Sequence, residues 1–430
     1  MILCLVLNNL SPDRRDIHLL IKMNMNKIKS TKTRYNADWC NSIDEISKDD
    51  WGQIFGYSIL EGYSFFYAME KAELSGASFF YLRIRDGQKI LALVPCFTYN
   101  LQLDVLAPVF IKKNAKKIRS IFSGFLQVKI LGVGSLASTC RQHIGILKGL
   151  TMEESDVIGK IISQEIKIKA KSLRHKLVFI KEVPSGQLNN IKAILSEDFY
   201  FYHSLPNSFI PILEETTPYP SGLKRKERER YKSLKKKFAE KYRWELVSDF
   251  SSLTTEFEKK YIDTYNRSKN KFEVLNKRFF DFINSELNQD SFLLIAKSLD
   301  GENQSIGLVL NEEDSLIPLY LGLNYDEKDS KTIKLLHLNS MLRVIEEAEE
   351  RGKSQVILGQ TSYYPKVLSG ALVEGLYLGF YSYNNFIQFF IRHFLGKLFT
   401  PTKVLDNVYK KEIGVRLKGW YSEQGIDICN

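Results

Sequence analysis

The sequence predicts a mixed α/β fold built from two tandem units, each a mixed sheet flanked by helices. Two observations support this prediction. The chain of 430 residues is long enough for two domains with cores of their own. Both halves also run in one order, with helices, a hairpin, a strand, a helix and a final strand. The hairpins turn at Asp86-Gly87 and Asp300-Gly301, and each turn separates two runs of β-forming residues.

The elements of the two halves can be taken in order. In the first half we expect helices over 42–51, 65–72 and 152–170, and strands over 78–85, 89–95 and 175–180. A further apolar segment lies at 128–134, and the segments 199–202 and 205–213 close the first half. In the second half we expect helices over 223–241, 257–269, 278–287 and 386–399, and strands over 243–247, 291–297, 304–311 and 376–383. The predicted organisation is a flexible tail over 1–34, a first domain over 35–215, a second over 216–384, and a C-terminal helix and tail over 385–430.

Residues 316–371 contain the clearest unit of the second half. An apolar run (316–323) precedes a helical pattern, and a second apolar run (356–358) follows it. The predicted apolar face of this helix consists of Leu335, Leu338, Leu342, Ile345 and Ala348. Strand–helix–strand units usually bind ligands at the carboxyl ends of their strands and at the helix N-terminus.

The composition is that of a globular protein, with 44% hydrophobic and 26% charged residues. The net charge of +11 favours anionic partners, such as CoA-type phosphates, nucleic acid or acidic lipid surfaces. The five cysteines include no close pairs, so we expect neither a disulfide framework nor a metal site. The start MILCLVL is too short for a signal peptide, and no apolar run could span a membrane. We therefore expect a cytoplasmic protein, with peripheral contact at the inner membrane face left open.

Several motifs follow one another in an order that resembles a known family. In the second half they are Leu223-Lys-Arg-Lys-Glu-Arg-Glu-Arg230, Asp300-Gly301 with Ser305-Ile-Gly-Leu-Val-Leu310, Leu336-His-Leu338 through Gly352, and Gly359-Gln360 followed by Tyr364-Pro-Lys366 and Gly370. In the first half they are Trp51, Glu70 and Val94-Pro95. In this order they resemble the FemAB-like branch of the GNAT (acyl-CoA N-acyltransferase-like) superfamily, which is associated with peptidoglycan biosynthesis.

The resemblance implies two GNAT-like units and transfer of an acetyl, fatty acyl or aminoacyl group. The acceptor would be an amine on a cell-envelope or natural-product precursor, and a phosphorylated or lipid-linked acceptor remains open. No cofactor would be bound permanently, and acyl-CoA would be a co-substrate. However, the turn at 324–332 lacks the glycines of a CoA pyrophosphate loop and carries three acids. A CoA thioester, an acyl carrier and aminoacyl-tRNA therefore all remain open as donors.

Acyl transfer to an amine needs a base, a proton donor for the leaving group and hydrogen bonds to the oxyanion. For catalysis we predict Lys366, Tyr364 and His337. For substrate binding we predict Arg225, Arg228, Gln360, Asn324 and Tyr325, and for phosphate contacts of the co-substrate Lys331 and Lys334. Each residue also has a structural interpretation: packing for the tyrosines, burial for His337, and a solvated position for the lysines and arginines.

Two features keep a second function open. The basic helix at 223–241 could bind nucleic acid or an acidic membrane in a catalytically inactive tandem GNAT. The aromatic-rich helix at 386–399 could lie in a membrane interface, although docking on the protein core would explain the same residues.

Overall fold

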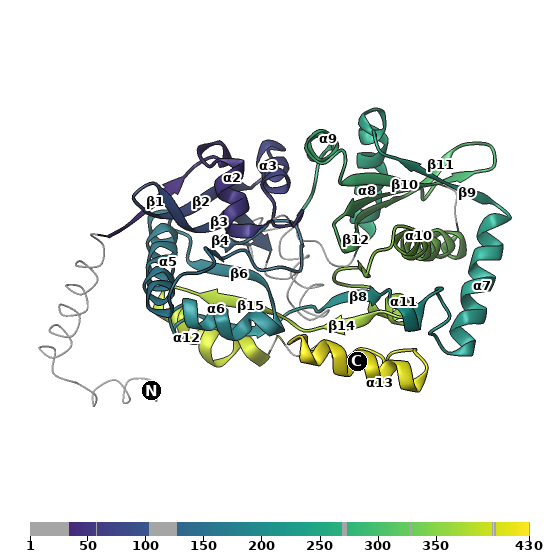
Figure 1. Ribbon diagram of the computed structural model, residues 1–430. Coiled ribbons are helices and arrows are strands. Elements are labelled where there is room, and N and C mark those ends of the chain that lie inside the picture. The colour runs from purple at the N-terminus through teal and green to yellow at the C-terminus, as the bar shows by residue number, and fades with distance from the viewer. Residues whose placement is uncertain are drawn as a thin grey trace, which may run out of the picture.

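The computed structural model describes residues 34–56, 58–102, 127–268, 273–326, 329–397, 399 and 401–429. Apart from Arg34, the predicted N-terminal tail lies outside these residues. Figure 1 shows two mixed sheets side by side with helices around them, which confirms the predicted fold class.

The first sheet has the strand order β1-β2-β3-β4-β6-β15-β7, and β5 pairs with β3. Its strands are β1 (Tyr35–Cys40), β2 (Ser78–Asp86), β3 (Lys89–Gln102), β4 (Gln127–Val133), β5 (Gly145–Ile146), β6 (Leu177–Pro184), β7 (Tyr200–His203) and β15 (Leu376–Tyr381). The helices beside it are α2 (Lys48–Phe55), α3 (Tyr63–Lys71), α5 (Met152–Ser172), α6 (Leu188–Ile194) and α12 (Asn385–His393).

The second sheet has the order β14-β8-β13-β12-β11-β10-β9. Its strands are β8 (Asn207–Pro211), β9 (Tyr242–Val247), β10 (Ser291–Ser298), β11 (Asn303–Asn311), β12 (Ser315–Leu323), β13 (Gln355–Ile357) and β14 (Leu372–Glu374). The helices beside it are α7 (Arg225–Ala239), α8 (Thr254–Arg267), α9 (Lys277–Glu286), α10 (Ser330–Glu350), α11 (Tyr363–Leu368) and α13 (Lys411–Glu423).

The predicted repeat is visible in the strand orders. The first sheet begins with β1, the antiparallel hairpin β2–β3, and β4, which pairs in parallel with β6. The second sheet begins in the same way with β9, the hairpin β10–β11, and β12, which pairs in parallel with β13. In each sheet the next strand comes from the other half of the chain. β15 pairs with β6 in the first sheet, and β8 pairs with β13 in the second. The domain limits at 215 and 384 stay a prediction, but hydrogen-bonded ladders cross both halves, so the units cannot separate without breaking sheets.

Alternation along the strands explains how the second sheet is covered on both faces. Leu293 and Leu308 point to the face covered by α8 and α9, in a core that also reaches α3 of the first half. Phe292 and Val309 point to the opposite face, against α10. The pairing of Phe65 with Phe279, at 6.1 Å between ring centroids, joins the two halves within one core.

Helix α10 also buries residues that lie outside its predicted apolar face. Leu336 is buried although it lies outside that face, because it packs with Ala296 and Leu323 of the sheet and with Phe238 of α7. Glu347, one of the acidic residues at the end of this helix, is also buried. Its carboxylate pairs with Arg343 at 2.5 Å and Arg351 at 2.6 Å. These ion pairs help to pack the end of α10.

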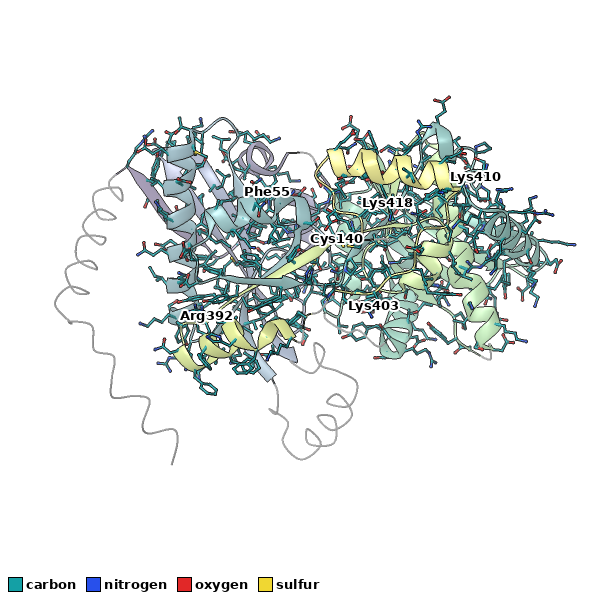
Figure 2. All side chains as sticks on the ribbon, turned by 90° about the horizontal axis from the view of Figure 1, so that it is seen from below. Phe55, Cys140, Arg392, Lys403, Lys410 and Lys418 are labelled. Atoms are coloured by element: carbon teal, nitrogen blue, oxygen red, sulfur yellow. The ribbon has the colours of Figure 1, made fainter. Side chains whose placement is uncertain are left out.

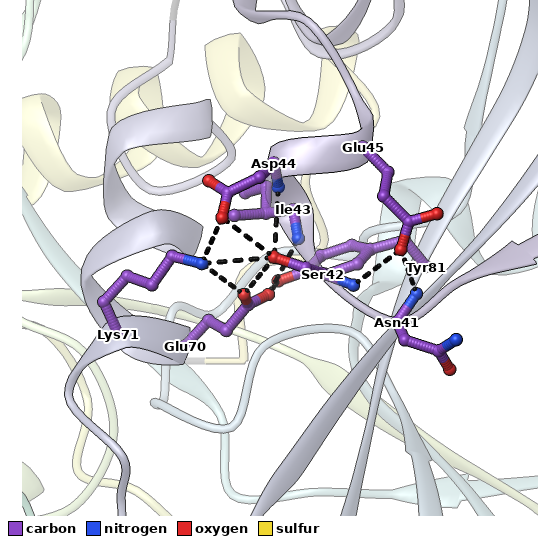
Figure 3. A network of polar contacts seen from close by, with 8 residues as sticks. All are labelled: Asn41, Ser42, Ile43, Asp44, Glu45, Glu70, Lys71 and Tyr81. Atoms are coloured by element: carbon purple, nitrogen blue, oxygen red, sulfur yellow. Dashed lines mark hydrogen bonds and ion pairs between the residues drawn. The ribbon is translucent and has the colours of Figure 1, made fainter.

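Glu70, one of the motif residues, has a structural role in the first unit. Its carboxylate accepts hydrogen bonds from the Ser42 hydroxyl (2.7 Å), the Ile43 amide (2.9 Å) and the Tyr81 hydroxyl (2.8 Å). Lys71 pairs with the same carboxylate at 2.9 Å (Figure 3). This network joins the turn after β1, helix α3 and strand β2, so Glu70 fixes the edge of the unit.

The C-terminal region differs from its prediction. The helix predicted over 386–399 ends at His393, and a short 3₁₀ turn follows at Leu395–Lys397. The predicted tail contains α13, whose Tyr421 packs against Phe209 of β8 with ring centroids 4.9 Å apart. The expectation of a plain tail was wrong because Leu417 and Tyr421 supply an apolar stripe that covers the edge of the second sheet.

Gly322 is expected to be one of the least tolerant positions of the fold. A Cβ there would stand 2.7 Å from the backbone nitrogen of Tyr261, which α8 cannot easily move. We expect Gly322→Ala to lower the free energy of unfolding by about 1–3 kcal/mol. Urea denaturation would measure this change.

Gly52→Ala is the matched control, because Gly52 lies in α2 and an added Cβ meets nothing within 4 Å. It should be neutral or raise stability by up to about 1 kcal/mol through helix propensity. Equal effects of the two variants would contradict the close contact between α8 and β12.

Candidate functional site

The parallel strands of the second sheet part soon after they meet. In the first sheet, β4 and β6 pair over four positions, from Ile130 with Leu177 to Val133 with Ile180. In the second, β12 and β13 pair only at Ser315 with Gln355 and at Leu316 with Val356. Beyond this point β12 continues for seven more residues, and no strand partner is described on that side. Pro318 fits such an edge because it lacks an N–H group.

A cavity of about 690 Å³ lies at this opening, between the two sheets. Its walls come from β12, α8 and α10 of the second unit and from β6 and the 138–140 loop of the first. Much of the lining is apolar, including Phe179, Leu319, Leu321, Met341, Val344 and Leu378. A cavity of this size and character is typical of a small-molecule or cofactor site.

Each sheet has an irregularity where it borders the cavity. In β12 the register places Tyr320 opposite Leu308 but Pro318 opposite Val309, so Leu319 is an extra residue. In β6 two residues, Lys181 and Glu182, lie between the paired residues Ile180 and Val183. On β15 only Leu378 lies between their partners, so β6 has an extra residue. Bulges re-aim side chains and often border functional sites, and here Leu319, Lys181, Glu182 and Leu378 all line the cavity.

Glu182 organises one wall of the cavity. It is 2% exposed and has a φ of 57°, in the left-handed region. Its carboxylate accepts hydrogen bonds from the Ser138 hydroxyl at 2.7 Å and from the amides of Thr139 and Cys140 at 2.8 and 2.6 Å. The neighbouring Thr139 hydroxyl is buried and has no hydrogen-bond partner among the described residues. It is therefore a polar group available to a ligand.

Lys366 also lines the cavity, where its ammonium binds a turn that Ser138 joins to the Glu182 wall through a hydrogen bond to Gln360 (3.3 Å). Nζ donates to the carbonyl oxygens of Leu358 at 2.7 Å, Gly359 at 3.0 Å and Gln360 at 2.8 Å. Burial lowers the pKa of Lys366 to about 7, whereas three acceptors match the three donors of a charged ammonium. The side chain thus fixes the end of β13, where Gly359, Thr361 and Ser362 all have positive φ.

His337 reaches the same cavity from α10. No hydrogen-bond partner of its ring is described among the residues of the structure. Burial lowers the pKa of this imidazole, and the positive charge of Lys366 acts in the same direction. His337 is therefore neutral at neutral pH, with a ring nitrogen free to accept a proton.

A polar corner of the cavity contains tyrosines and one carboxylate. The Tyr320 hydroxyl donates to Glu273 at 3.2 Å, and Tyr261 packs on Tyr320 with ring centroids 5.5 Å apart. Burial and the carboxylate of Glu273 raise the pKa of Tyr320 well above its usual value. Tyr320 therefore remains a hydrogen-bond donor at neutral pH.

The structure brings three of the predicted site residues together and leaves the others apart. Lys366, His337 and Gln360 line the cavity. Gln360 lies on the turn that Lys366 holds, and its amide nitrogen donates to the Leu205 carbonyl at 2.7 Å. Tyr364 does not line the cavity and is 64% exposed. The physical reason is that residues 363–368 form a helix, which turns Tyr363 and Lys366 to one side and Tyr364 to another.

The remaining predicted residues lie outside the cavity. Arg225 is exposed on α7, and Arg228 donates to the Leu223 carbonyl at 2.6 Å. Asn324 caps its own turn by accepting from the Asp326 amide, and the Arg267 guanidinium stacks on Tyr325 at 4.4 Å. Their assignment to substrate binding stays a prediction, without support from the arrangement of this cavity.

The start of α10 does not suit the phosphates of CoA. Asp329 is the N-cap, and its carboxylate accepts from the Thr332 amide at 2.7 Å. A carboxylate at this position satisfies an amide that a phosphate would use and repels a second anion. Lys331 and Lys334 are exposed on the first turns of the helix and do not line the cavity. If a CoA thioester is the donor, its phosphates must bind elsewhere.

The first-half wall of the cavity could not be predicted from the sequence. Glu182, Thr139 and the Tyr320–Glu273 pair have no local pattern that marks them, because the strands that bring them together are far apart in the chain. Among the described residues, no group of three or more His, Cys, Asp or Glu could hold a metal ion.

Several solved structures are similar to this chain. FemX has 11% sequence identity and a TM-score of 0.48, over 83% of this chain and 100% of that one. L-PGS from Bacillus licheniformis has 11% identity and a TM-score of 0.44, over 82% and 94%. A tandem GNAT protein from the clavulanic acid biosynthesis pathway has 8% identity and a TM-score of 0.43, over 81% and 98%.

No family model and no curated protein sequence matches the chain.

Proposed function

We propose that this protein is a GNAT-type acyltransferase whose reaction takes place in the cavity at the parting of β12 and β13. One observation carries the proposal. Strands β12 and β13 of the second unit part, whereas the equivalent strands β4 and β6 of the first unit stay paired, and His337 lines the cavity at this opening. The ordered motifs of the second half support the same assignment.

In this proposal the acceptor is an amine and His337 is the base. The amine nitrogen attacks the acyl carbonyl carbon and its proton passes to the imidazole. The bond from that carbon to the sulfur or oxygen of the donor then breaks, and the imidazolium returns the proton to the leaving group. Unpaired backbone groups along the edge of β12 would bind an extended donor arm, as a strand added to a sheet does. The Thr139 hydroxyl is the buried donor available for a polar group of either substrate.

The lining favours an apolar acyl group over a charged one. Apolar residues of the lining include Phe179, Val309, Ile317, Leu319, Met341 and Leu378. A fatty acyl chain would lose its contact with water beside them at a gain of about 0.8 kcal/mol per methylene. The carboxylates of the lining, Glu182 and Glu273, already accept hydrogen bonds, so the ammonium of a lysyl group would have to compete for them.

The test is a transfer assay with CoA thioesters of increasing chain length, in which thiol release is measured in the presence of simple primary amines. We expect turnover to rise from acetyl to long-chain thioesters. Ser340→Phe, which narrows the cavity from α10, should shift the preference back to short chains. Its unfolding temperature is measured in parallel, because Ser340 is buried and the larger side chain is expected to cost stability. No release with any thioester, together with transfer that is lost after RNase treatment of a charged-tRNA assay, would contradict a thioester donor.

A second candidate function rests on α7. Its basic residues Lys224, Arg225, Lys226, Lys232, Lys236 and Lys237 are exposed, and the helix packs away from the cavity. A surface of this kind fits a nucleic acid backbone, including that of an aminoacyl-tRNA donor. Binding of RNA with a steep salt dependence, reduced by Lys232→Glu with Lys236→Glu, would favour this function.

A further inference from the structure

The underside of the molecule carries an aromatic stripe that the cavity does not use. Phe386, Phe389, Phe390 and Phe394 are 80%, 56%, 43% and 44% exposed. They lie at the spacing of one helical face, while Ile391 on the opposite face of α12 is buried in the core. The prediction of docking on the core is therefore right for only one side of this helix.

The same underside carries basic residues and further exposed apolar groups. Figure 2, seen from below, shows α12 and α13 in front, with Arg392, Lys403, Lys410 and Lys418 on this side. Leu405, Val415 and Trp420 are also exposed, at 46%, 65% and 43%. From 385 to 429 the sequence has seven basic residues, Arg392, Lys397, Lys403, Lys410, Lys411, Arg416 and Lys418, against four acidic ones, Asp406, Glu412, Glu423 and Asp427.

We propose that this face, defined by α12 and α13, binds the surface of a bilayer that contains anionic lipids. Phenylalanines on one side of a short helix, with Arg392 and Lys397 in the same segment, have the composition of helices that lie in a membrane interface. The lysines of α13 lie further along the same underside (Figure 2). Aromatic side chains enter the headgroup region, and each nearby lysine or arginine gains from the negative surface potential. No helix among the described residues is long and apolar enough to cross the bilayer, so the contact would be peripheral.

A second copy of the chain fits this face less well. In a symmetric dimer the same patch would meet itself, which would bring its basic residues together within a pair of chains that each carry a net charge of +11. An anionic lipid surface meets the aromatic groups and the positive charge at once. The positive charge of the face therefore favours an anionic lipid surface over a second copy of the chain.

One consequence rests on the proposed function. Phe399 and Thr402, which follow α12 directly, line the cavity. A bilayer bound to α12 would therefore lie beside the segment that forms part of the acyl site. An acyl donor or a lipid-linked acceptor could then pass between the bilayer and the cavity without crossing the body of the protein.

The experiment is co-sedimentation of the full chain with vesicles of phosphatidylcholine alone or of equal parts phosphatidylcholine and phosphatidylglycerol. We expect binding to the mixed vesicles and at least tenfold weaker binding to the neutral ones. Phe386→Ser with Phe389→Ser should weaken binding to the mixed vesicles on the order of tenfold or more. Lys410→Glu with Lys418→Glu should lower it by a similar factor.

Two matched controls assign the effect to this face. Met152→Ser removes an 86% exposed apolar side chain elsewhere and should leave binding unchanged. Lys232→Glu with Lys236→Glu reverses the same number of charges on α7 and should lower binding by no more than about twofold through net charge. The acyl-transfer rate in solution is measured in parallel and should not change in the Phe386 and Phe389 variant. A variant that loses transfer but still binds vesicles would count against the proposed function and not against membrane binding.

Three results would overturn the proposal. The first is absence of sedimentation with both kinds of vesicle. The second is binding that depends on the α7 lysines and not on the phenylalanines of α12. The third is a concentration-dependent dimer in analytical ultracentrifugation that the Phe386 and Phe389 variant abolishes without any effect of lipid, because the occupant would then be a second copy.

Discussion

His337→Ala should lower the rate of acyl transfer by roughly 10²- to 10⁴-fold, the usual contribution of a positioned base. Two imidazoles line this cavity, and His337 is the one on α10, beside the opening between β12 and β13. The other, His203 of β7, packs on Tyr377 with ring centroids 4.8 Å apart. The measurement is thiol release under single-turnover conditions with the thioester that gives the highest rate in the chain-length panel.

The pH dependence of the same reaction gives a second readout. Burial and Lys366 lower the pKa of His337, so its base form persists below the usual histidine pKa of 6.5. The acidic limb of the rate profile should therefore lie below this value and disappear in His337→Ala. His175→Ala is the control, because that ring bonds to the Leu173 carbonyl in the first unit and lies outside the cavity. An unchanged profile in His337→Ala would exclude this residue as the base.

Lys366→Met should lower the free energy of unfolding by about 2–4 kcal/mol. The substitution keeps the length of the side chain but removes the ammonium that donates to three carbonyl oxygens. These buried oxygens would then lack a hydrogen-bond donor. Transfer should also fall, because Gly359 and Gln360 would no longer be held at the cavity wall. Urea denaturation and the transfer assay measure the two effects.

Lys353→Met is the matched control for this prediction. The ammonium of Lys353 also donates to two carbonyl oxygens, of Glu312 and Glu313, but it is more exposed. Water can replace its hydrogen bonds, so we expect a loss of less than about 1 kcal/mol. If Lys366→Met costs no more than Lys353→Met, Lys366 does not hold the turn, and a direct chemical role becomes the better explanation.

Local patterns allowed the repeated order of elements to be predicted from the sequence. Both Asp-Gly hairpins form, and the strand–helix–strand unit after residue 315 forms as β12, α10 and β13. These features depend on contacts between neighbours in the chain, which hydrophobic period and turn residues describe well. The exchange of β8 and β15 between the sheets could not be predicted in this way, because a strand has no local signal for its partner.

The site was predictable only in part for the same reason. His337, Gln360 and Lys366 lie close in sequence to the parting strands, so the motif pointed to them. Tyr364 was misplaced by the helical turn of α11, and Glu182 belongs to the other unit, 155 residues before His337. The role of Lys366 in binding carbonyl groups also depends on a backbone turn that only the structure describes.

Amide hydrogen exchange tests the central claim, that the acyl donor binds where β12 and β13 part. It compares the chain with and without the preferred thioester. We expect slower exchange over residues 317–322 and 357–362, and no change over 130–133 of β4 in the first unit, none of which lines the cavity. Protection confined to the first unit or to α7, with β12 unchanged, would contradict the account.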